Sequence, residues 1–143
     1  MKSQRLRKRK KNQKQRKRLN DMIDNEMKKL IEDNALAFAS ISENGNPHCI
    51  AVAFTKVVSD NEILITNNFI NETEKNISKN PNVALTVWNK EWKEKCMGFE
   101  LKGNASYFTE GKWYDMIKKL PENKDYPCKG AILVKVSKVK KLV

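Results

Sequence analysis

Apolar and polar residues alternate over much of this chain, which predicts a protein built mainly from β-strands. Asn44-Gly45, a strong hairpin-turn signal, separates the first two strand-like segments. Strands in hairpin order predict a closed antiparallel barrel, because closure leaves no long sheet edge exposed. The six predicted strands are residues 35–41, 47–58, 62–66, 82–89, 98–109 and 131–139.

Helical periodicity appears in three places. Apolar residues follow i, i+3, i+4 spacing from Leu19 to Ile31, which predicts an amphipathic helix of about three turns. Short helices are predicted at residues 73–79 and 109–120. The first of these follows a strand and a turn-rich loop, and its start would offer free backbone N–H groups and a positive dipole end to an anion.

The positive charge is concentrated at the amino terminus. The formal net charge is +12, but residues 1–18 alone hold eleven Lys and Arg residues and no acid, whereas the rest carries 18 lysines against 17 acids. We expect residues 1–18 to form a disordered or helical tail, and weak contact with nucleic acid is one of three interpretations of it. The alternatives are a plain extension, or a translation start at Met22 or Met27.

The cysteine and histidine contents argue against several classes of site. Three separated cysteines indicate neither a disulfide framework nor a zinc site, and they favour reduced thiols in a cytoplasmic protein. His48 is the only histidine, so a His-rich metal centre or a Ser-His-Asp triad is not expected. We expect His48 to be a strand or turn residue. No apolar stretch predicts a membrane span or a secretory signal.

Residues 63–88 form one unit of strand, loop, helix and strand, with the pattern Asn-Pro-x-Val-Ala-Leu at residues 80–85. With Gly45-Asn46-Pro47-His48 and Lys102-Gly103-Asn104-Ala105, this unit resembles the FMN-binding split-barrel family, which includes pyridoxamine 5'-phosphate oxidases. The likeness covers residues 36–142. It implies that residues 19–143 form a six-stranded antiparallel split β-barrel of Greek-key order, which binds FMN and forms a homodimer.

The resemblance also implies a set of cofactor-binding residues. Thr73 is expected to bind the FMN phosphate at the helix start, while strand residues contact the flavin ring and loop asparagines contact ring or ribityl groups. Asn71 could instead only cap the helix, paired with Glu74. The full set is Val52, Ala53, Phe54, Lys56, Thr66, Asn67, Asn68, Asn71, Thr73 and Asn76. Candidates for stacking across a dimer boundary are Trp88, Trp92, Trp113 and Tyr126.

The sequence departs from the family pattern at the phosphate corner. Glu72 stands where the family usually has a cation, Ala51 replaces an arginine, and residues 131–143 contain no arginine. Pyridoxamine 5'-phosphate oxidation itself is therefore not expected. The resemblance implies an FMN-dependent oxidoreductase acting on an unidentified small molecule, with no catalytic residue assigned. A deazaflavin cofactor, or a barrel without cofactor that serves as a binding module, are the alternatives.

Overall fold

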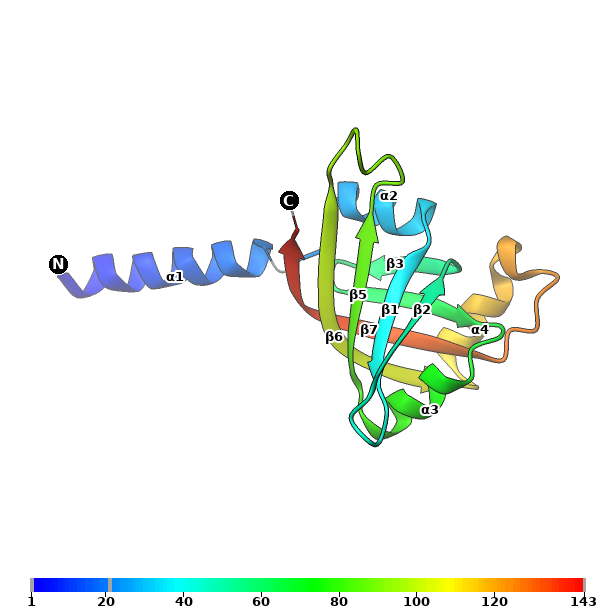
Figure 1. Cartoon of the computed structure of the whole chain (residues 1–143). Coiled ribbons are helices and arrows are strands. Elements are labelled where there is room, and N and C mark those ends of the chain that lie inside the picture. The colour runs from blue at the N-terminus through cyan, green and yellow to red at the C-terminus, as the bar shows by residue number, and fades with distance from the viewer. Residues whose placement is uncertain (1, 21, 143) are drawn as a thin grey trace.

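The computed structural model of the chain describes residues 2–20 and 22–142, and within the first range the side chains of residues 3–15. Its body is one antiparallel sheet of seven strands in the order β2-β1-β5-β6-β7-β4-β3. In Figure 1, β1, β2, β5 and β6 run roughly upright, and β3, β4 and β7 cross behind them. The strands are β1 (Leu36–Ile41), β2 (Pro47–Val52), β3 (Thr55–Ser59), β4 (Glu62–Asn67), β5 (Asn82–Trp88), β6 (Gly98–Phe108) and β7 (Gly130–Lys141).

The prediction of six strands in a closed barrel is wrong in its number of strands and in its closure. The predicted strand 47–58 is two strands. Alternate residues of one strand face the same side, but Val52 and Thr55, three residues apart, are both buried, so the alternation is interrupted between them. At the break, the carbonyl of Phe54 accepts a hydrogen bond from Thr66 N at 3.0 Å. β2 then pairs with β1, while β3 pairs with β4. Among the described residues these two strands are the sheet's unpaired ends, so the sheet does not close.

The main hydrophobic core lies between the two crossing parts of the sheet. Phe38 and Leu85 from one part and Ile65 and Ile132 from the other are almost completely buried in one cluster. A second, smaller cluster packs Ile117 and its neighbours against the other face of β4 and β7. The strands therefore enclose the main core, and the two helices that connect strands lie at the margins of the sheet (Figure 1).

The predicted helix from Leu19 to Ile31 is also divided. The chain forms α1 (Lys2–Asn20) and α2 (Asn25–Asp33). Between them, Ile23 is buried and donates its N–H to the carbonyl of Asp60 at 2.7 Å, and the Asp24 carboxylate accepts the N–H of Met27 at 2.8 Å as an N-cap. These bonds hold the chain extended and start a new helix.

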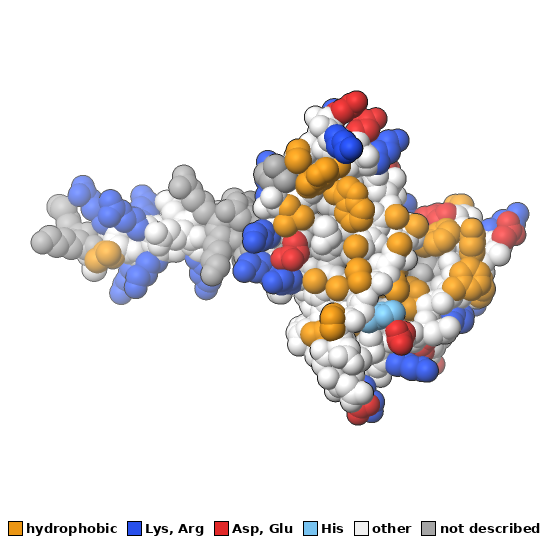
Figure 2. Space-filling model, in the orientation of Figure 1, with side chains coloured by type: hydrophobic (Ala, Val, Ile, Leu, Met, Phe, Trp, Pro, Cys, Tyr) orange, Lys and Arg blue, Asp and Glu red, His pale blue; other side chains and the backbone are white. Residues whose placement is uncertain are grey.

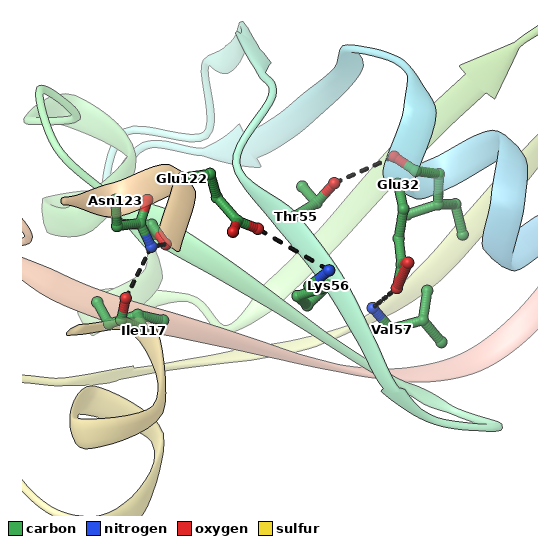
Figure 3. Close-up of polar contacts among 9 residues, drawn as sticks. Glu32, Thr55, Lys56, Val57, Ile117, Glu122 and Asn123 are labelled. Atoms are coloured by element: carbon green, nitrogen blue, oxygen red, sulfur yellow. Dashed lines mark hydrogen bonds and ion pairs between the residues drawn. The ribbon is translucent and has the colours of Figure 1, made fainter. Parts of the chain in front are cut away.

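Helix α2 is anchored to the start of β3. The hydroxyl of Thr55 donates to the carbonyl of Ile31 at 3.1 Å, and the N–H of Val57 donates to the Glu32 carboxylate at 3.1 Å (Figure 3). The two other predicted helices are confirmed as α3 (Glu72–Lys79) and α4 (Lys112–Lys119), the latter followed by a 3-10 turn at Pro121–Asn123. Helix α3 connects β4 to β5. No helix within the described ranges is long and apolar enough to cross a membrane.

Candidate functional site

A cavity of about 460 Å³ opens between β2, the link from β2 to β3, and the loop from β4 to α3. This volume falls in the range of small-molecule and cofactor sites, about 300 to 1,000 Å³. Most of its wall is apolar, and its polar groups gather where α3 begins. The lining residues are His48, Ile50, Ala51, Val52, Ala53, Phe54, Thr66, Asn68, Phe69, Ile70, Asn71, Glu72 and Thr73.

The loop from β4 to α3 is held in shape by Asn67. This side chain is fully buried; its amide oxygen accepts the N–H of Ile70 at 2.8 Å, and its amide nitrogen donates to the Ile70 carbonyl at 3.1 Å and to the Tyr107 hydroxyl at 3.0 Å. Burial raises the pKa of Tyr107 above its usual value. Asn67 does not line the cavity. It shapes the loop from behind, which differs from the expected direct contact with a cofactor.

Tyr107 can lie beside Asn67 because residue 130 is glycine. A Cβ atom built at Gly130 would come within 2.3 Å of the Tyr107 ring, far inside van der Waals contact. The strand register brings Tyr107, Gly130 and Asn67 together. Gly130 on β7 pairs with Asn67 on β4, and Ile132 on β7 pairs with Tyr107 on β6. Three strands thus meet behind the loop that forms the polar wall of the cavity.

The start of α3 has no side-chain cap among the described residues. Asn71 occupies the N-cap position, but its side chain makes no capping hydrogen bond, so the predicted Asn71–Glu74 capping pattern is wrong. The backbone of Asn71 is near the helical region instead of the extended region that cap residues adopt, and its amide oxygen accepts from Lys129 Nζ at 3.1 Å. The first N–H groups of α3 have no acceptor inside the helix, so they are available to water or to a ligand.

Two cavity-lining residues carry polar atoms without a partner in the described part of the chain. The hydroxyl of Thr73 is completely buried and makes no hydrogen bond. The amide nitrogen of Asn68 is likewise unpartnered, although its amide oxygen accepts the N–H of Cys128 at 2.9 Å. A buried polar group left unsatisfied costs about 1 to 3 kcal/mol, so such groups in a native fold call for an explanation. A ligand that accepts hydrogen bonds would supply one.

Glu72 does not stand alone at the polar end of the cavity. Its carboxylate lies 2.8 Å from His48 Nδ1, which reaches it from β2. Glu72 is 70% exposed and His48 26% exposed, so the pair sits at the cavity mouth and not in its depth. His48 is a strand residue, as expected. Its contact with Glu72 places a hydrogen-bond donor against the one carboxylate of the cavity lining and holds that carboxylate toward β2.

Two more of the expected cofactor-binding side chains, besides Asn67, point elsewhere. Lys56 lies 3.9 Å from the Glu122 carboxylate, toward which Figure 3 shows it directed, and it does not line the cavity. Asn76 donates to the Ser40 hydroxyl at 3.0 Å in a buried contact, also away from the cavity lining. The remaining expected residues outside the loop, namely Val52, Ala53, Phe54 and Thr66, all line the cavity.

The cation beside the polar end is Lys129, which sequence reasoning missed. Its ammonium group lies 3.3 Å from the Ile70 carbonyl and 3.1 Å from the Asn71 side chain. Lys129 reaches this loop because its own N–H donates to the Asn67 carbonyl and β7 pairs with β4 immediately afterwards. Lys129 lies about sixty residues from this loop in the sequence. Recognising it would have required knowledge that β4 pairs with β7.

The cavity also has an aromatic end, defined by Phe54 and Phe69 in its lining. The ring of Phe54 packs at 4.7 Å, centroid to centroid, against Tyr126, and Phe69 lies 6.4 Å from the same ring. Phe69 is 72% exposed and forms part of the rim. Of the other predicted stacking candidates, Trp113 packs on the smaller core cluster, and Trp88 and Trp92 are 41% and 37% exposed away from the cavity lining.

The residues present fit FMN in their chemistry. A flavin needs an apolar slot for its ring and several donors for its phosphate, and the cavity offers both a mostly apolar wall and donors at the start of α3. The donors are the uncapped start of α3, the Thr73 hydroxyl and the Asn68 amide, with Lys129 as a nearby cation. No cluster of His, Cys, Asp or Glu within residues 2–20 and 22–142 could hold a metal ion.

Comparison with known proteins places this fold and cavity in context. The family profile described as Pyridoxamine 5'-phosphate oxidase matches residues 23–142. An uncharacterized protein of Methanocaldococcus jannaschii is 33% identical over 121 residues, which cover 82% of this chain and 78% of the relative. Among solved structures, HupZ from Group A Streptococcus has a TM-score of 0.77 at 24% identity, covering 85% of this chain and 94% of that one.

A second solved structure is similar over almost the whole chain. It is an FMN-binding protein from Syntrophomonas wolfei subsp. wolfei, with a TM-score of 0.76 at 20% identity and a coverage of 94% of each chain. Both structural likenesses concern the fold alone. The family profile, by contrast, spans every strand of the sheet and all residues that line the cavity. The chain therefore belongs to the pyridoxamine 5'-phosphate oxidase family.

Proposed function

We propose that this protein is an FMN-binding flavoprotein and an oxidoreductase that acts on a small molecule. One observation carries the proposal: two buried polar atoms without partners, on Asn68 and Thr73, line the same cavity as the uncapped start of α3. Both side chains can donate a hydrogen bond, and a phosphate offers only acceptors. The family membership and the FMN-binding neighbour support the same cofactor.

In this proposal each end of the cavity has a separate role. Thr73 and the first N–H groups of α3 bind the phosphate, Asn68 donates to the ribityl chain or the phosphate, and Lys129 contributes positive charge. Val52, Ala53 and Phe54 contact the flavin ring. When bound, the isoalloxazine supplies the redox chemistry, and the protein supplies orientation and access.

The charge at the polar end favours an anion in spite of Glu72. The dipole of α3 places about half a positive charge at its start, and Lys129 adds a full one close by. The Glu72 carboxylate is exposed and is bound by His48, so its repulsion acts through a water-rich, screened surface. We therefore expect the carboxylate to weaken FMN binding without preventing it.

We also propose a homodimer, formed through the outward face of β1, β2 and β5. Small side chains make this face flat. Ala37 on β1 pairs with Ala51 on β2 and with Thr86 on β5. Ala39 on β1 likewise pairs with Cys49 on β2 and with Ala84 on β5. Figure 2 shows apolar side chains spread over the front of the body, where these strands run. Ala51 also lines the cavity, so a second copy on this face would border the flavin site.

The absorption spectrum of the untreated protein tests the cofactor. We expect a yellow protein that releases FMN, identified by its mass, when it is denatured. If the protein is colourless, the refolded or cofactor-stripped protein should be titrated with FMN. A colourless protein whose melting temperature does not rise with excess FMN would contradict the proposal and favour the binding-module alternative, and release of a deazaflavin would assign a different cofactor to the same cavity.

Sedimentation at several protein concentrations tests the dimer. An Ala39→Glu substitution places a charge in the middle of the proposed interface and should produce monomers. Lys124→Glu changes an exposed residue beyond that face and should leave the dimer intact. A wild-type protein that sediments as a monomer at all concentrations would refute the interface.

A further inference from the structure

Over residues 3–15, helix α1 is a cationic arm without an apolar face. Over residues 3–15 every side chain is exposed, and Figure 1 shows the helix projecting from the body. It contains no acidic residue in its first turn, and the chain has none before Asp21. Among residues 3–15, the one exposed large apolar side chain is Leu6. The exposed cations of this segment are Arg5, Arg7, Lys8, Arg9, Lys10, Lys11 and Lys14.

The cations lie on opposite sides of the helix. With about 3.6 residues per turn, Arg5, Lys8 and Arg9 share one side. The others, Arg7, Lys10, Lys11 and Lys14, fall on the other side. Blue side chains accordingly appear on both margins of α1 in Figure 2. A helix that lies on a membrane, or that docks in an apolar groove of a protein, needs an apolar stripe, which this arrangement lacks.

We propose that α1 binds duplex DNA by lying in its major groove. A flat anionic surface can contact only one side of a helix, whereas a helix in a groove has a phosphate backbone on each side. The major groove of B-form DNA is about 12 Å wide and admits an α-helix of about 10 to 12 Å diameter. The two cationic sides of α1 match the two backbones, and contacts with phosphates carry little sequence specificity.

The positive surface continues onto the body. Lys138, Lys140 and Lys141 are exposed on the last part of β7, and Lys102 is paired with Lys138 across β6 and β7. Figure 1 places the carboxyl end of β7 on the side of the body from which α1 departs, and Figure 2 shows basic side chains there. Glu100 lies 3.6 Å from Lys102 and reduces the local charge. These lysines extend the phosphate-binding surface beyond the helix.

The proposal predicts a steep dependence on salt. If six cations of α1 contact phosphates, the logarithm of the binding constant should fall with the logarithm of salt concentration with a slope of about −5. Affinity should then fall about a thousandfold between 50 and 200 mM salt. Duplex RNA should bind less tightly than DNA of the same sequence, because the A-form major groove is deep and narrow.

Fluorescence anisotropy with the full-length protein and a labelled duplex tests this. The variant Arg5→Gln, Arg7→Gln, Arg9→Gln, Lys11→Gln removes four charges and keeps good helix-forming residues. The control Lys75→Gln, Lys79→Gln, Lys119→Gln, Lys124→Gln removes the same charge from exposed lysines of the body. We expect the arm variant to lower the slope by about four, and the control to change it by less than one.

Several results would overturn the proposal. Equal losses in the two variants would show that net charge alone governs binding. Tighter binding to vesicles of phosphatidylserine and phosphatidylcholine than to DNA would assign the arm to membranes. Tighter binding to duplex RNA than to DNA would exclude placement in a B-form groove. Circular dichroism of both variants checks that the helical content is unchanged, and the flavin content of the protein has no bearing on any of these results.

Discussion

The two ends of the cavity are built in different ways. The polar end depends on a short loop and the start of α3, where one buried side chain, Asn67, makes the hydrogen bonds that fix the loop. The aromatic end depends on packing between Phe54, Phe69 and Tyr126, which come from three separate segments. The polar end leaves donors without partners, whereas the aromatic end leaves an exposed ring at the rim.

We therefore expect the two ends of the cavity to recognise different parts of a flavin. Hydrogen-bond donors are directional and recognise a phosphate, so changes at the polar end should affect FMN and spare riboflavin, which lacks the phosphate. Aromatic packing is less directional and recognises a flat ring, so changes at the aromatic end should affect both ligands equally. For a substitution that changes flavin binding, the ratio of the FMN affinity to the riboflavin affinity reports which end of the cavity has been changed.

Replacing Asn67 should have the largest effect. Asn67→Ala removes the bonds to Ile70 and leaves the partly buried Tyr107 hydroxyl without this partner, so we expect the free energy of unfolding to fall by about 3 kcal/mol. Chemical denaturation of the cofactor-free protein measures it. Asn82→Ala removes an exposed asparagine and should change the value by less than about 0.5 kcal/mol. Similar values for the two variants would refute the role of Asn67.

Replacing Thr73 should raise the stability of the cofactor-free protein and weaken its binding of FMN. Thr73→Val keeps the shape of the side chain but removes a buried hydroxyl without a partner, so the cofactor-free protein should become more stable by about 1 kcal/mol. FMN should bind about thirtyfold more weakly, because a hydrogen bond to a charged group is lost. Riboflavin affinity should not change. Thr109→Val, at an exposed position just after β6 and outside the cavity lining, is the control. Unchanged FMN binding by Thr73→Val would contradict the phosphate contact.

Replacing Phe54 should weaken both ligands. Phe54→Ala removes a ring that lines the cavity and packs on Tyr126, so FMN and riboflavin should each bind about tenfold more weakly. Phe69→Ala, at the exposed rim, should have a smaller effect of the same kind. Flavin fluorescence titration gives both constants. A loss for FMN alone would show that the ring does not lie at this end.

Replacing Glu72 should have the smallest effect. Glu72→Gln removes the exposed carboxylate at the phosphate corner, so FMN should bind about threefold more tightly at low salt, and the gain should shrink as salt screens the charge. Glu122→Gln removes a carboxylate that pairs with Lys56 outside the cavity and should leave affinity unchanged. Weaker FMN binding by Glu72→Gln would mean that the contact with His48 supports the site.

The local pattern of the sequence predicted much of the polar end. The unit from β4 through α3 to β5 was recognised as one piece, and Asn68, Asn71 and Thr73 within it do line the cavity. The short helix and the strands on either side of it follow from apolar spacing and turn residues over a few positions. Such local signals were enough to locate the start of α3, which is the feature on which the proposed phosphate site depends.

Contacts between distant segments could not be predicted in this way. The pair His48 and Glu72 joins β2 to α3, and Lys129 reaches the same loop from the start of β7. The break at residues 53–54 depends on β2 and β3 pairing at opposite ends of the sheet. Lys56 and Asn76 were expected at the cavity, but their partners, Glu122 and Ser40, belong to segments that only the folded sheet brings near.

A parallel titration of the cofactor-free protein with FMN and with riboflavin tests the central claim most directly. The two ligands share the ring and ribityl chain and differ in the phosphate, so their affinity ratio measures the contribution of the α3 corner. We expect FMN to bind about a hundredfold more tightly, as several charge-assisted hydrogen bonds would give. Equal affinities, or a preference for riboflavin, would contradict a phosphate site at Thr73.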